Sequence, residues 1–473
     1  MRGVEAEVGG GGPRLAASED RPPRRSSQPR AAPRPAARLA GLTVAAIPVA
    51  AVLLFGAVED EHALPIEAAA LVIGAGSLLA RARRGARPLP APRVTLPVLL
   101  LVALPAIQLV PLPPHALAVL SPRLAEIRPV VTTLSVHPYA TGGALLRWLA
   151  YAAFLVACLE LLRRPGAAAS ALAAVCGLGI AEAIYGVGNL LLGNRTLLWL
   201  PRTAYFADAT GTLVNHNHYA TVLVLCLFAV LARRWLARPR ADPGEEHGMT
   251  AACIVGATAI GLGVLLSSSR GGMLALAAGL AISAAFASGD RESRRGRWMI
   301  AGVALLTVVY GGYVALDPVV QRFAIIGREV RGRPRLWLDV LVLAADFPVV
   351  GAGAGTFETV FPAYRERTRD QVAYAHAHQD YLELAAEGGI LGIGLGAIAA
   401  VAFWAQVGAG LGQARGRRRL ALAALSGGIA GALLHAAVDF PLHVPGVVFL
   451  LILLGAIALT QARELADREL AAG

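Results

Sequence analysis

The sequence predicts an all-α polytopic membrane protein. Of its 473 residues, 56% are hydrophobic and only 16% are charged, whereas a soluble domain carries roughly 25% charged residues. The mean hydropathy is +0.59. Apolar runs long enough to cross a hydrocarbon core of about 30 Å recur along the chain. Together these observations exclude an ordinary soluble domain.

The apolar runs predict about twelve transmembrane helices by the usual length criterion. They lie at 39–58, 63–81, 94–112, 146–162, 167–192, 213–232, 250–268, 272–288, 298–316, 388–411, 418–438 and 444–461. Two connections, roughly 113–145 and 317–387, are too long to be simple turns. The second lies between the ninth and tenth spans and has a helical pattern of its own, which is usually a sign of function.

The arginines predict the orientation of these spans. The net charge is +12 and the chain contains no lysine. A basic chain can indicate nucleic-acid binding, but here the arginines gather in short loops, which fits topology better and predicts no nucleic-acid partner. By the positive-inside rule both termini are cytoplasmic, and both long connections lie outside. The inside loops are those at 81–93, 163–164, 233–240, 291–297 and 415–419, and the outside loops include 59–61 and 439–444.

The same pattern divides the chain into four parts. Residues 1–38 are rich in Arg and Pro and predict a disordered cytoplasmic tail. Transmembrane helices follow at 39–192, and a second membrane domain at 193–463 includes the loop 317–387; residues 464–473 form a cytoplasmic tail. The four cysteines fall inside apolar runs at unrelated spacings, so they indicate small buried side chains rather than disulfides or a metal set.

Several arginines on the predicted outer side are candidates for binding an anionic ligand. Arg270 lies in the short turn Ser267-Ser-Ser-Arg-Gly-Gly272 at the mouth of two helices, where a phosphate could also meet a helix N-terminus. The alternative is an arginine that reaches the interface. In the long loop, Arg335 belongs to a cluster interleaved with acidic residues. That cluster fits either an ion-paired surface or a phosphate-binding group, because guanidinium binds phosphate oxygens bidentately.

Two further polar groups lie at predicted helix ends. Asn215-His-Asn-His218 opens a span, where these residues fit either a helix cap or the lining of a sugar or phosphate site. His435 and Asp439 are four residues apart and share a helix face at the outer boundary. Ionisable residues at this depth are functional candidates, and a structural hydrogen-bonded pair is an equal alternative.

The stretch from Tyr374 to Gly392 concentrates the candidate chemistry. His376 and His378 with Asp380 resemble part of a zinc motif, but the motif's final histidine is replaced by Tyr381, so we expect no metal. From Asp380 onward the pattern is helical, and Asp380 with Glu383 fits a helix cap. Capping does not explain His378. An imidazole with an ordinary pKa near 6.5 is a natural general base for a sugar hydroxyl, and a packing role is the alternative.

These residues resemble the O-antigen ligase and O-antigen polymerase superfamily. His378-Gln379, nine residues and then Gly389-Ile-Leu-Gly392 fit the pattern H-[NSQ]-x9-G-x-x-G of the ligases' large periplasmic loop. The segments around Arg335, around Ser-Ser-Arg270-Gly-Gly and from Leu434 to Pro441 are also similar. The resemblance covers roughly 200–450 and implies a GT-C-like architecture in the bacterial inner membrane.

The resemblance implies that a glycan is transferred from undecaprenyl diphosphate to a lipid or glycan acceptor without a metal or other cofactor. It implies His378 as the catalytic base and Arg270 and Arg335 as ligands of the diphosphate. Asn215, His218 and His435 are the further substrate-binding candidates. A polymerase or a protein glycosyltransferase of the same superfamily stays open, as do two other classes, a transporter and an envelope scaffold.

Overall fold

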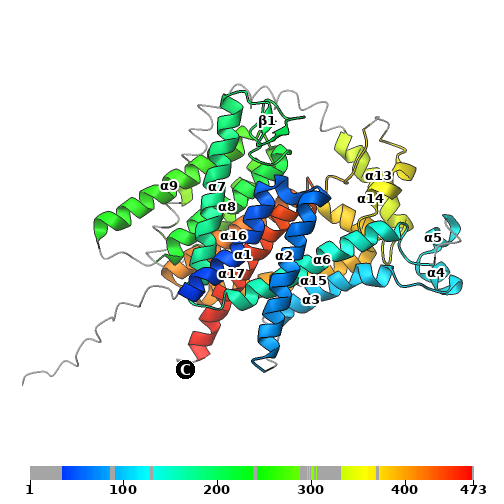
Figure 1. Ribbon diagram of the computed structural model, residues 1–473, viewed down its shortest axis with the longest axis horizontal. Coiled ribbons are helices and arrows are strands. Elements are labelled where there is room, and N and C mark those ends of the chain that lie inside the picture. Colours follow the sequence, from blue (N-terminus) through cyan, green and yellow to red (C-terminus); the bar gives the residue numbers. More distant parts are fainter. Residues whose placement is uncertain are drawn as a thin grey trace, which may run out of the picture.

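The computed structural model is mostly helical with almost no strand, which confirms the predicted all-α membrane architecture (Figure 1). The structure describes residues 35–85, 91–127, 132–237, 242–287, 332–368 and 372–470, with isolated positions between 294 and 305. Among these, nine helices are long and apolar enough to span a membrane. They are α1 (Pro35–Leu53), α2 (Asp60–Ala82), α6 (Pro138–Leu161), α7 (Ala167–Leu191), α8 (His216–Leu236), α9 (Pro243–Leu266), α15 (Asp380–Gln413), α16 (Gly416–Ala436) and α17 (Pro445–Leu470).

Two shorter apolar helices, α3 (Pro92–Gln108) and α10 (Arg270–Phe286), account for two more of the predicted runs. Eleven of the expected spans therefore correspond to helices that the structure describes. The run expected at 298–316 lies largely outside the described residues, as do nearly all of the predicted tail and residues 317–331.

Helix α8 is the centre of the bundle. It packs against α7, α9, α10 and α16, and 89% of its apolar window is buried, compared with 11% for α15. Small residues allow the close packing around it: a Cβ on Gly428 of α16 would lie 2.6 Å from Phe228. Helix α8 thus fixes the positions of its neighbours, while most of α15 faces outward from the protein.

The loops that were predicted to share a side meet at the same end of the bundle. At one end the Thr212 hydroxyl donates to the carbonyl of Val52, and His216 contacts the carbonyl of Ser267. At the other end Arg417 donates to the carbonyl of Arg234, and Arg81 pairs with Glu160. Loops of opposite predicted side therefore separate in space as the arginine pattern requires.

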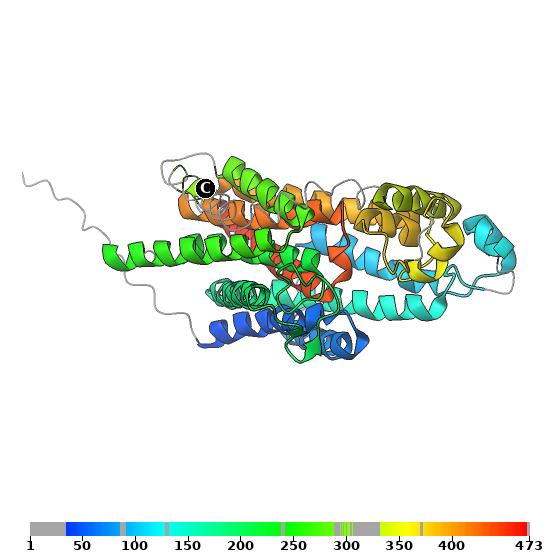
Figure 2. The same ribbon diagram turned by 90° about the horizontal axis from the view of Figure 1, so that it is seen from above.

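The two long connections fold together at the first of these ends, where they project from the helices (Figure 2). Helices α4 (Pro114–Leu120) and α5 (Pro122–Ile127) come from the first connection. Helices α13 (Gly332–Asp346) and α14 (Phe357–Val360) and the 3₁₀ turn η2 (Phe361–Tyr364) come from the second. They share a small hydrophobic core that includes Leu124, Val136, Leu343, Phe347 and Phe361. We call this unit the loop domain.

A chain crossing joins the loop domain to α15. The backbone of α15 breaks at Gly389, whose φ is +59°, and Ile390 N–H there donates to the carbonyl of Pro348 at 2.8 Å. A Cβ on Gly389 would lie 2.5 Å from the Val349 backbone, and one on Gly351 would lie 2.1 Å from that of Glu387. Glycine is required on both sides because the two backbones touch.

A short hairpin, β1 (Thr196–Leu197) and β2 (Leu200–Pro201), lies in the α7–α8 connection, with Thr196 opposite Pro201. The turn η1 (Phe55–Ala57) joins α1 to α2, and η3 (Pro441–His443) joins α16 to α17. The cysteines are unpaired, and Cys158, Cys226 and Cys253 are buried, in agreement with their predicted packing role.

Candidate active site

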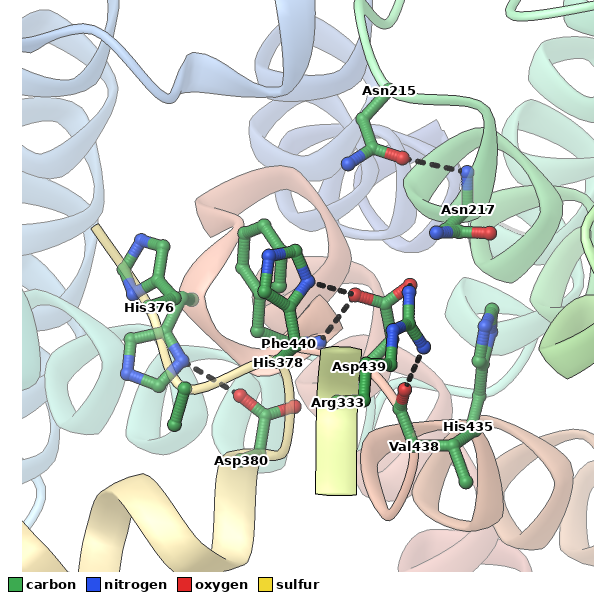
Figure 3. A network of polar contacts seen from close by, with 12 residues as sticks. Asn215, Asn217, Arg333, His376, His378, Asp380, His435, Val438, Asp439 and Phe440 are labelled. Atoms are coloured by element: carbon green, nitrogen blue, oxygen red, sulfur yellow. Dashed lines mark hydrogen bonds and ion pairs between the residues drawn. The ribbon is translucent and has the colours of Figure 1, made fainter. Parts of the chain in front are cut away.

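A polar group lies at the end of the bundle that carries the loop domain (Figure 3). Its side chains come from the starts of α8, α10 and α13, the segment before α15, and the α16–η3 turn. Most of these segments are distant in sequence. Their convergence follows from the packing of α8 and α16 and from the crossing of the loop domain over α15.

His378 and Asp439 form the central pair. The Nδ1 atom of His378 lies 3.5 Å from Oδ1 of Asp439, and Figure 3 shows the imidazole turned toward the carboxylate. This separation is longer than a normal hydrogen bond, so the contact is a loose ion pair when the imidazole is protonated. His378 also has a φ of +51°, a conformation that L-residues seldom adopt and that often marks a functional site.

Arg333 lies on the other side of Asp439. Its guanidinium donates to the carbonyl of Val438 and lies 3.8 Å from Oδ2 of Asp439. Burial alone would raise the pKa of Asp439, but contact with His378 and the positive charge of Arg333 outweigh burial and lower it. Asp439 therefore stays ionised and places a negative charge beside the His378 imidazole.

The Phe440 ring connects the histidines of the group. Its centroid lies 4.7 Å from the rings of His218, His376 and His378; the His376 ring is stacked on it, and the other two meet it edge to face. A rigid aromatic ring in this position limits the rotamers of all three imidazoles. The residue after Asp439 thus orients the side chains around that carboxylate.

The three candidate residues at the start of α8 and the end of α16 differ in their hydrogen bonds. His218 is buried, and its Nε2 atom has no hydrogen-bond partner within the described part of the chain. His435 is also buried, but its Nδ1 lies 2.8 Å from the hydroxyl of Thr221. Asn215 caps α8, because its side chain accepts from the N–H of Asn217 at 2.8 Å. Of the three, His218 is the one with a fully buried ring nitrogen that has no hydrogen-bond partner among the described residues.

Arg270 begins α10 beside this group. Ser269 caps the helix by accepting from Gly272 N–H at 3.1 Å. The next residue, Gly271, faces His435 so closely that a Cβ there would lie 2.5 Å from the ring Nε2. Gly271 therefore lets the start of α10 approach His435 on α16, and Gly272 lets it approach Ala220 on α8.

Arg335 does not join the group. It is exposed on α13, two residues after Arg333, and residues two apart on a helix face different directions. The superfamily resemblance implies Arg335 within a cluster of loop arginines, whereas the structure brings Arg333 to Asp439. No sequence signal separates the two arginines, because the choice depends on the rotation of α13.

The expected capping role of Asp380 and Glu383 is corrected by the structure. Gln379 is the N-cap of α15, and its side chain accepts from Leu382 N–H. Asp380 Oδ1 lies instead 2.6 Å from Nδ1 of His443, and Glu383 Oε1 lies 2.8 Å from Nδ1 of His376. Both acids bind imidazoles, one of them 63 residues away, which a local capping rule cannot detect.

Glu387 ties the loop domain to α15. Its two carboxylate oxygens accept from the N–H groups of Gly355 and Phe357, each at 2.9 Å. Gln108 of α3 reinforces the crossing by donating to the carbonyls of Val350 and Glu387. Glu387 is therefore structural, and it holds the segment that follows His378.

Comparison with known proteins gives one family match, which covers the middle of the chain. Residues 254–397 match a family model described as O-antigen ligase. The match includes Arg270, Arg333 and His378, whereas His218 and Asp439 lie outside it. No curated protein matches the chain. The match and the helical membrane architecture agree with the motif pattern around His378, and they support the resemblance of this part of the chain to the O-antigen ligase and O-antigen polymerase superfamily.

Proposed function

We propose that the chain is an O-antigen ligase-like glycosyltransferase that moves a glycan from undecaprenyl diphosphate to an acceptor hydroxyl. The observation that carries the proposal is the pairing of His378 with the ionised Asp439. A carboxylate near Nδ1 stabilises the imidazolium that forms when Nε2 of His378 accepts a proton. An imidazole beside an ionised carboxylate is suited to act as a general base.

In the proposed reaction the acceptor oxygen attacks the anomeric carbon of the glycan. The bond between that carbon and the diphosphate oxygen breaks, and undecaprenyl diphosphate leaves with the bonding electrons. His378 Nε2 takes the proton of the hydroxyl. Direct displacement inverts the configuration at the anomeric carbon. The diphosphate is a good leaving group, so positioning and charge stabilisation supply most of the rate increase.

Arginine is assigned to the diphosphate, and no metal ion takes part in the transfer. Arg270 at the start of α10 keeps the role that the superfamily resemblance implies. The position of Arg333 beside Asp439 supports giving Arg333, rather than Arg335, the second role at the diphosphate. Arg333 is partly exposed, with 39% of its side chain accessible, so it can reach a ligand and keep its contact with Val438.

His218 and His435 are assigned to the acceptor side. The unpartnered Nε2 of His218 lies in a buried position next to Phe440, and a buried polar atom without a partner is costly unless a ligand or water binds it. A sugar hydroxyl meets that need. Asn215 stays a peripheral candidate because its carbonyl oxygen already caps α8.

The proposed setting is the bacterial inner membrane, with both termini in the cytoplasm and the site at the outer face. The separation of the arginine-rich loops from the site supports this orientation. Within the superfamily, a polymerase uses a growing chain as acceptor and a protein glycosyltransferase uses a side-chain hydroxyl. All three reactions use the same base and the same leaving group.

Reconstituted full-length protein tests the proposal. Membranes or proteoliposomes receive a synthetic undecaprenyl-diphosphate glycan and a lipid or glycan acceptor, and gel analysis follows product. We expect His378→Ala to abolish transfer while the protein still accumulates in the membrane. His115→Ala is the matched control, because His115 is exposed in the loop domain. Unchanged transfer by His378→Ala would refute the proposal.

A further inference from the structure

A second cluster of metal-ligand side chains lies on the far side of Phe440 from Asp439. His376 comes from the segment before α15, Glu383 from the first turn of α15, and His443 from η3. One ligand atom of each lies within 4.8 Å of the other two. Glu383 Oε1 is the shared centre, at 2.8 Å from Nδ1 of His376 and 3.1 Å from Nε2 of His443.

Hydrogen bonds hold the second nitrogen of His443 and the second oxygen of Glu383. Nδ1 of His443 lies 2.6 Å from Oδ1 of Asp380, whose other oxygen accepts from Leu442 N–H at 3.0 Å. Oε2 of Glu383 accepts from Ala377 N–H at 2.7 Å. A carboxylate behind one nitrogen of a histidine is the usual arrangement around a metal-bound imidazole, because it sets the tautomer and directs the other nitrogen inward.

We propose that His376, Glu383 and His443 bind a zinc ion. Two imidazole nitrogens and one carboxylate oxygen are a ligand set that suits zinc. In a tetrahedral site with bonds near 2.0–2.1 Å, ligand atoms stand roughly 3.3 Å apart. The two contacts at Glu383 Oε1 are already close to that separation. Binding displaces the protons that now join these atoms, and a water or ligand oxygen takes the fourth position.

The proposed set differs from the zinc motif weighed in the sequence, which used His376, His378 and Asp380. In the structure His378 turns to Asp439, and Asp380 lies behind His443 rather than among the ligands. Glu383 and His443 complete the set instead. His443 could not be selected from sequence, because 60 residues separate it from Glu383 and only the fold brings them together.

The ion would act as a positioning group and stands apart from the proposed transfer, in which arginine binds the diphosphate. It would join the segment that carries His378 to the turn that carries Asp439 and Phe440. His376 is stacked on Phe440 with an interplanar angle of 27°, so an ion at His376 also fixes the ring against which His378 packs.

Metal analysis of the full-length protein tests the proposal. The chain is purified in detergent through a tag without histidine, stripped with chelator, loaded with zinc and desalted. We expect about one zinc per chain by mass spectrometry and a higher midpoint of thermal unfolding than in the stripped protein. Cobalt in place of zinc should give the visible absorption of a tetrahedral site.

Glu383→Gln and His376→Asn are the decisive variants, with His115→Ala as the control outside the cluster. We expect both variants to lose the bound zinc and the zinc-dependent rise in thermal stability, and the control to keep both. Wild-type protein that retains no more zinc than Glu383→Gln would overturn the proposal and leave a proton-held network. If a variant does not fold, the zinc titration of stripped wild-type protein alone decides the outcome.

Discussion

Nδ1 of His378 lies 3.5 Å from a carboxylate oxygen of Asp439. This contact connects the segment before α15 to the turn that follows α16. Asp439 contacts Arg333 on its other side. The pair was not evident as a unit in the sequence, because 61 residues separate its members (439 − 378).

Asp439→Asn should slow transfer by about 10²-fold or more, since an amide cannot stabilise the imidazolium of His378. The KM for the donor should change little, because Asp439 is not assigned to the diphosphate. Steady-state kinetics on reconstituted protein measure both quantities. The double variant with His378→Ala should be no slower than His378→Ala alone, since residues that act as a unit are not additive. Additive losses would contradict the pairing.

Arg333→Ala should lower the rate of transfer by about 10²-fold through lost charge stabilisation, whereas Arg335→Ala should change it little. Arg335 is a close control because it lies on the same helix, carries the same charge and is exposed. Initial rates at saturating and low donor concentrations distinguish a loss in kcat from one in KM. If both variants lost the same fraction of the transfer rate, the loop arginines would act on the diphosphate as a group, and Arg333 would have no special role.

Gly389→Ala and Gly351→Ala should both destabilise the protein strongly. Each glycine has a positive φ, +59° and +75°, and an added Cβ would overlap the neighbouring backbone. The left-handed conformation alone costs roughly 1–2 kcal/mol for an L-residue, and the overlap adds to it. Thermal unfolding in detergent gives the comparison. Gly394→Ala is the control, since a Cβ there has open space; equal loss in all three would show that the crossing is unimportant.

Asp339→Asn should destabilise the loop domain at neutral pH. Asp339 is fully buried and accepts from the N–H groups of Arg367 and Thr368. Burial would raise the pKa of Asp339, but these hydrogen bonds outweigh it and lower the pKa. Its ionised form therefore stabilises the fold above the unfolded value of about 3.9, and this contribution is lost as the pH falls through the lower folded pKa.

The expected loss for Asp339→Asn at pH 7 is about 1–3 kcal/mol. At pH values below about 4, the free energies of unfolding of the variant and of wild type should differ by less than they do at pH 7. Thermal unfolding or hydrogen exchange of the loop domain, at pH 7 and at a pH below about 4, measures this difference in stability. Glu358→Gln, on an exposed side chain of the same domain, controls for a change of charge. A difference that stays constant with pH would show that the carboxylate charge is not responsible.

The helices and their grouping were predictable from sequence because they depend on local composition. The arginine pattern also predicted which loops meet. The glycines of the G-x-x-G pattern were visible as a pattern, but the backbone crossing that requires Gly389 was not. The choice of Arg333 over Arg335 and the pairing of Asp380 with His443 depend on helix rotation and distant packing. Local rules contain no information on either.

The shared core of the loop domain has a consequence for chimeric proteins. The connection that contains α4 and α5 buries Leu124 and Val136 against Leu343 and Phe347 of the later connection. An exchange of the later connection alone would leave half of this interface unmatched. If such exchanges are used to alter which acceptor the protein selects, the two connections have to be transferred as one unit, although 171 residues (146–316) separate them along the chain.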